Sequence, residues 1–121
     1  MIGYVTLGTN DMERALPFYD AVLAELGAKR GFKNDRLQFY AGRHGMFAIG
    51  KPYDGYGASA GNGTMVALTA RDRETVDRVY TKAISLGAKD EGAPGARSDT
   101  FYGAYFRDLD GNKLCIFHYT G

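Results

Sequence analysis

The chain has 121 residues, with 15 basic and 14 acidic side chains scattered along it and one cysteine, Cys115. This length fits one domain with one core, the mixed charges leave no basic stripe for nucleic acid, and a lone cysteine excludes an intrachain disulfide. No stretch is typical of a transmembrane span or a signal peptide, so we expect a cytoplasmic protein with no membrane partner.

The first elements are a strand and a helix. Residues 4–8 alternate apolar with small or polar side chains, which predicts a strand covered on one face. Asn10 or Asp11 can cap a helix whose apolar stripe continues to Leu26, and Gly27 is suited to end it. Pro17 lies inside this stripe, so the helix either kinks there or begins near it. Short strands are predicted at residues 36–41 and 45–50.

The opening pattern returns later in the chain. A shift of 61 positions aligns Val5 with Val66 and Asp11 with Asp72, and Leu-Gly-Ala-Lys occurs identically at 26–29 and 86–89. A second helix is predicted from the cap Asp72 to the stop at Gly87. We interpret these matches as an internal duplication. The alternative, that two strand-helix units converged on one pattern, explains them less well. The halves are residues 1–53 and 64–121, joined by a glycine-rich linker at 54–63.

The second half ends in a predicted hairpin. Two apolar runs between Phe101 and Tyr119 flank a turn at residues 108–112, where Gly111 suits a positive φ angle. Because the bulky positions of the strands recur in both halves, Val5, Leu7, Val66 and Leu68 are expected to face the helices. The opposite faces of the two halves would then form a cup, and concavities of this kind bind ligands.

These motifs resemble the vicinal oxygen chelate superfamily, which includes glyoxalase I, bleomycin-resistance proteins and extradiol dioxygenases. The resemblance rests on YVTLGTNDMERALPFYDAVLAELG, on GNGTMVAL and on RDLDGNKLCIF, in which Leu109 replaces the family's usual proline. It implies an α+β fold. Two tandem βαβββ modules would form a cupped, mostly antiparallel eight-stranded arrangement with helices on the outer face. It also implies a homodimer.

Metal-using members of the family carry His or Glu at four positions. The matching residues here are Tyr4, Met65, Cys115 and, in a looser alignment, Ala48. A phenol, a thioether and one thiol are a poor ligand set for a divalent cation. We therefore predict no metal ligands and no cofactor. His44 is interpreted as a solvated turn residue and His118 as a strand-end or interface residue.

Cys115 would face the cup, and two interpretations of it remain. It is either a thiol activated by Lys113 or, more simply, a small apolar side chain that fills space. Arginines and aromatic rings on loops and strands near the rim could hold an anion or stack on a planar ligand. The expected ligand-binding residues are Tyr4, Met65, Cys115, Arg43, Tyr53, Tyr56, Arg97 and Tyr102.

Two classes of function follow. The first is a binding protein that holds a small, partly aromatic or drug-like molecule in an apolar pocket without a metal. The second is a glyoxalase-like lyase or isomerase, or a dioxygenase-type enzyme, with a divergent metal site or metal-free acid-base chemistry. No catalytic residue is identified for the second class.

Overall fold

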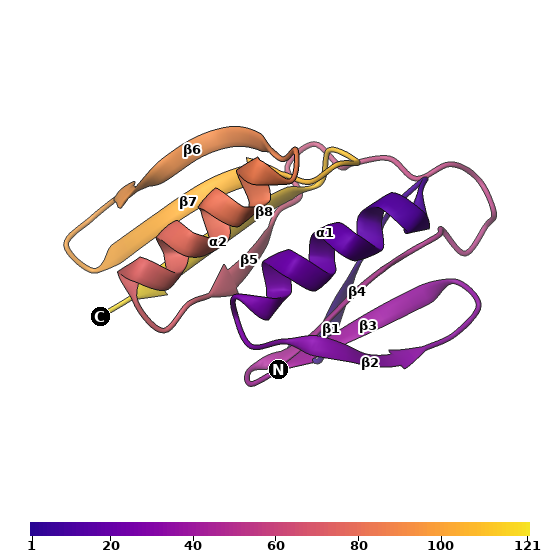
Figure 1. Cartoon of the computed structure of the whole chain (residues 1–121), viewed down its shortest axis with the longest axis horizontal. Coiled ribbons are helices and arrows are strands. Elements are labelled where there is room, and N and C mark those ends of the chain that lie inside the picture. Colours follow the sequence, from indigo (N-terminus) through magenta and orange to yellow (C-terminus); the bar gives the residue numbers. More distant parts are fainter.

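Each half of the chain folds as a strand, a helix and three further strands (Figure 1). The computed structural model describes all residues from 1 to 121. The first half contains β1 (Tyr4–Gly8), α1 (Met12–Ala24), β2 (Lys29–Lys33), β3 (Leu37–Gly42) and β4 (Gly45–Gly50). The second contains β5 (Val66–Thr69), α2 (Arg73–Ser85), β6 (Lys89–Ala96), β7 (Phe101–Arg107) and β8 (Lys113–Tyr119). The predicted α+β class and tandem βαβββ arrangement are confirmed.

The helix ends are those that the sequence predicts. The Asp11 carboxylate accepts a hydrogen bond from the Arg14 amide (3.1 Å), and Asp72 accepts one from the Thr75 amide (2.7 Å). These bonds satisfy amide groups that a helix N-terminus leaves free. Pro17 lies inside α1, whose first residue is Met12, so the helix does not begin at the proline. Neither helix is both long and apolar enough to span a bilayer.

The strands form two four-stranded sheets with the orders β1-β4-β3-β2 and β5-β8-β7-β6. Within each sheet one pair is parallel, β1 with β4 or β5 with β8, and the other two pairs are antiparallel. The registers Val5–Phe47 and Val66–Leu114 show that the two sheets repeat each other. Edge strands β1 and β5 lie toward the middle of the molecule, where the halves meet (Figure 1).

The two halves share one core. Seventeen buried apolar residues from both halves form a single cluster under α1 and α2. Val5, Leu7, Val66 and Leu68 pack against this cluster, as their alternation predicts. The opposite faces of the sheets, called here the open faces, have no helix over them. Tyr4 and Met65 lie on these faces and are exposed.

The turn between β7 and β8 ties the second half to the first. Asn112 donates from its amide Nδ2 to the Gly8 carbonyl (2.9 Å), and the buried Asp108 carboxylate accepts from the Tyr19 hydroxyl of α1. Gly111 has φ +90°, as the predicted turn requires. We call residues 108–112 the latch turn, because its side chains close one end of the seam between the halves.

Candidate functional site

The four positions at which the family resemblance would place metal ligands lie on the open faces. Tyr4 and Ala48 belong to β1 and β4 of the first sheet, and Cys115 lies on β8 beside Ala67 of β5. Their side chains offer a phenol, a methyl group and a thiol, and Met65 adds a thioether. No cluster of three or more His, Cys, Asp or Glu side chains occurs in the chain. These donors do not fit the family's divalent cation.

Cys115 is almost fully enclosed, with 1% of its surface exposed. Burial raises the pKa of its thiol above the ordinary value, although a hydrogen bond from Tyr105 and the charges of Arg97 and Lys113 act in the opposite direction. Arg97 and Lys113 both lie near the Tyr105 ring, at 5.4 and 5.7 Å from its centroid. The buried thiol is therefore held mainly in its protonated form, which is the weaker nucleophile.

The other predicted aromatic residues are dispersed. The Tyr102 hydroxyl donates to Asp77 of α2 (2.7 Å), so this ring faces the helix layer and lies opposite the Cys115 face. Tyr53 and Tyr56 are exposed beyond β4, and the Arg36 guanidinium lies 5.2 Å from the Tyr53 ring. The structure thus does not bring the predicted ligand-binding residues together at one place.

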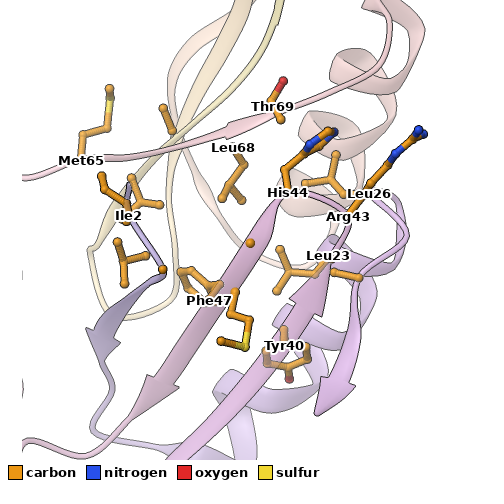
Figure 2. A pocket seen from close by; sticks show the side chains of 18 residues that line it. Ile2, Leu23, Leu26, Tyr40, Arg43, His44, Phe47, Met65, Leu68 and Thr69 are labelled. Carbon is orange, nitrogen blue, oxygen red and sulfur yellow. The ribbon is translucent and has the colours of Figure 1, made fainter. Parts of the chain in front are cut away.

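Two of the predicted ligand-binding residues, Arg43 and Met65, line one cavity. It has a volume of about 490 Å³ and lies between the two halves, with Val5 and Phe47 on one side and Val66 and Leu68 of β5 on the other. Figure 2 shows Leu23, Phe47 and Leu68 around its interior, and Arg43 and His44 on the turn at one end. We call this space the seam cavity. Twelve of the 18 residues that line it are hydrophobic.

The polar groups of the seam cavity are few. Tyr40 presents its ring to the cavity, while its hydroxyl donates to the Asp20 carboxylate (2.7 Å). Burial and this neighbouring carboxylate raise the pKa of Tyr40, so the ring stays neutral. Arg43, His44 and Thr69 are the other polar lining residues, and no Asp or Glu is among them. His44 thus sits on an exposed turn, as expected, but at the cavity rim.

Most of the lining was not predictable from sequence. Leu23, Leu26, Phe47 and Leu68 have the spacing of ordinary core positions, and nothing in that spacing separates a filled core from a cavity wall. The second histidine, His118, lies away from the cavity, and its Nδ1 contacts the Ala70 carbonyl (3.0 Å). This position near the end of β8 agrees with the strand-end interpretation.

Comparison with known proteins identifies relatives of the whole chain. The model of the Glyoxalase/Bleomycin resistance protein/Dioxygenase superfamily matches residues 1–116. A glyoxalase/bleomycin resistance protein from Albidiferax ferrireducens T118 is 39% identical, with a TM-score of 0.92, and the match covers 99% of each chain.

More distant structures share the fold. A glyoxalase/bleomycin resistance protein/dioxygenase family enzyme from Burkholderia phytofirmans PsJN is 19% identical over 98% of each chain, with a TM-score of 0.78. A putative glyoxalase from Bacillus halodurans is 21% identical over 98% of this chain and 95% of its own, with a TM-score of 0.79. No curated protein is similar enough to this chain to count as a match.

Proposed function

Because the chain belongs to the glyoxalase/bleomycin resistance protein/dioxygenase superfamily, we propose that it binds a small, largely apolar organic molecule in the seam cavity without a metal ion. The observation that carries the proposal is the cavity itself. Its volume of about 490 Å³ lies within the range of small-molecule sites, and its walls are mostly hydrophobic.

The physical driving force is burial of apolar surface. A ligand with an aliphatic or aromatic body would contact Leu23, Phe47 and Leu68, and each square ångström it removes from water contributes about 25 cal/mol. The loss of translational and rotational entropy opposes binding. The cavity walls are already formed, which reduces the further entropy cost of ordering side chains around the ligand. The aromatic Tyr40 and Phe47 offer ring faces for a planar ligand.

Metal-dependent catalysis is not part of this proposal, because Tyr4, Ala48, Met65 and Cys115 are a poor donor set for a divalent cation. The charge stabilisation that a cation supplies in such reactions would have no built site here. The protein purified without chelator is expected to contain no stoichiometric metal, as measured by elemental analysis. One tightly bound Zn²⁺, Ni²⁺, Mn²⁺ or Fe²⁺ per chain would contradict this and favour the enzyme alternative.

Binding is tested with a small panel of indole, naphthol, octanamide and octanoate, by thermal shift and then by calorimetry. We expect at least one compound to raise the melting temperature and to bind one to one. The substitution Ala67→Phe, on β5 at the cavity, should abolish that binding because the added ring occupies the site. Ala67 is exposed, so the variant should fold.

The matched control is Thr6→Phe. Thr6 occupies the equivalent position of β1 by the internal repeat, is also exposed, and does not line the cavity. This variant should bind the panel as the unmodified protein does. If no compound binds, or if both variants lose binding equally, the proposal that the seam cavity is the site is wrong.

A further inference from the structure

The two halves differ at one turn, and the seam cavity lies beside the shorter of the two turns. The latch turn of the second half sends Asp108 and Asn112 into the first half, where they meet Tyr19 and Gly8. The equivalent turn of the first half, between β3 and β4, is Gly42-Arg43-His44-Gly45. Gly42 and Gly45 belong to β3 and β4, so only Arg43 and His44 connect these strands, whereas five residues connect β7 and β8. This shorter turn carries no comparable side chains across the seam.

The consequence is a seam that is closed at one end and hollow at the other. The 61-position shift that aligns Leu7 with Leu68 also aligns Gly8, at the end of β1, with Thr69, at the end of β5. Gly8 is covered by Asn112, but Thr69 lines the cavity together with Gly42 and Gly45. The missing latch leaves space beside Arg43 and His44.

Arg43 is unusual among the nine arginines of the chain. The other eight each have a hydrogen-bond acceptor, a carboxylate or an aromatic ring within reach. The Arg43 guanidinium has none of these within the chain. It lies at the rim of an apolar cavity whose lining holds no acidic side chain, so positive charge there is not neutralised by the protein.

We infer that the seam cavity takes an amphipathic organic monocarboxylate, with the apolar body between the halves and the carboxylate paired with Arg43. A guanidinium binds a carboxylate through two parallel hydrogen bonds, and His44 and Thr69 place further donors at the same end. This inference rests on the proposed function and names its ligand class. A phosphate dianion fits less well, because Arg43 is the only always-charged group of the lining.

The test compares octanoate with octanamide, which has the same shape but no charge, by calorimetry at low ionic strength. Octanoate should bind about tenfold more tightly, since hydrogen bonds between charged groups are stronger than neutral ones. Arg43→Gln should remove this preference, so that octanoate and octanamide bind with equal affinity, and Arg43→Lys should restore part of it. Arg36→Gln, an exposed arginine outside the cavity, should change neither affinity.

The outcomes separate the inference from the proposed function. Equal affinities for the two compounds, or a preference that survives Arg43→Gln, would overturn carboxylate selection. Octanamide binding that is lost in Ala67→Phe would still support the cavity as a binding site. Octyl phosphate binding more tightly than octanoate would overturn the assignment to carboxylates. Failure of octanoate to bind at all would overturn the inference as well.

Discussion

At the scale of single residues, Cys115 shows how environment sets chemistry. It lies at a position that the family uses for a metal ligand, beside the positive charges of Arg97 and Lys113, which alone would activate a thiol. Burial is the larger effect and raises the thiol pKa. Of the two interpretations that the sequence left open, the buried, space-filling cysteine is the one that this environment favours.

We therefore predict that iodoacetamide modifies Cys115 about tenfold more slowly in the native protein than in urea, as followed by intact mass. Because the native thiol pKa is raised, the rate should also reach half its maximum at a higher pH than in the unfolded chain. Tyr105→Phe removes a hydrogen bond that lowers this pKa, so the pH at which the rate is half-maximal should be higher still in this variant. A native rate equal to the unfolded rate would contradict the prediction.

At the scale of elements, the latch turn is the strongest polar link between the halves. The Asp108 carboxylate accepts bonds from the amides of Asp110 and Asn112 (both 2.9 Å), from the Asn112 side chain (3.0 Å) and from Tyr19. Asp110 extends the link by accepting from the Asn10 amide (3.0 Å). Burial makes each lost partner costly, because the remaining donors cannot reach water.

Asp108→Ala is expected to lower the free energy of unfolding by about 2–4 kcal/mol, measured by urea denaturation. The control is Asp54→Ala, which also removes a carboxylate that accepts from a backbone amide, that of Tyr56 (3.0 Å), but in an exposed turn. That variant should change stability by less than about 0.5 kcal/mol. Similar losses in the two variants would show that the inter-half contacts of Asp108 contribute little.

At the scale of the whole molecule, the open faces of the two sheets carry several uncovered apolar side chains. Tyr4, Phe32, Met46, Met65 and Tyr119 are large, exposed and located on or beside these faces. The Tyr4 and Phe32 rings both pack edge-on against Phe39, so the first sheet presents a joined aromatic surface. Exposed apolar side chains that lie together favour association with another protein surface.

We propose that two copies of the chain pair through these faces. Light scattering should then give twice the 13.2 kDa chain mass. The double substitution Tyr4→Lys and Phe32→Lys should produce a monomer, because it places charges in the apolar contact. Tyr53→Lys, an exposed aromatic outside the sheets, should leave the dimer intact. A monomeric unmodified protein at high concentration would contradict the proposal.

The sequence by itself determined the elements and their order. Helix caps, apolar stripes and the Gly111 turn are local patterns, and a short window of neighbouring residues is enough to recognise each of them. The internal repeat then indicated the tandem arrangement, and the motifs indicated the family. The sequence also predicted that Tyr4, Met65 and Cys115 are a poor ligand set for a divalent cation, because that prediction depends on residue type alone.

Only the tertiary structure decided which residues form a cavity. Leu23 and Leu68 are far apart in sequence and look like core, and whether the space between them is filled depends on the turns that cross the seam. Tyr102 was expected at the rim but bonds to Asp77 of α2, because the register of β7 sets its face. Arg43 lacks a partner for a similar reason: pairing depends on every other element that surrounds it, and no local pattern contains that information.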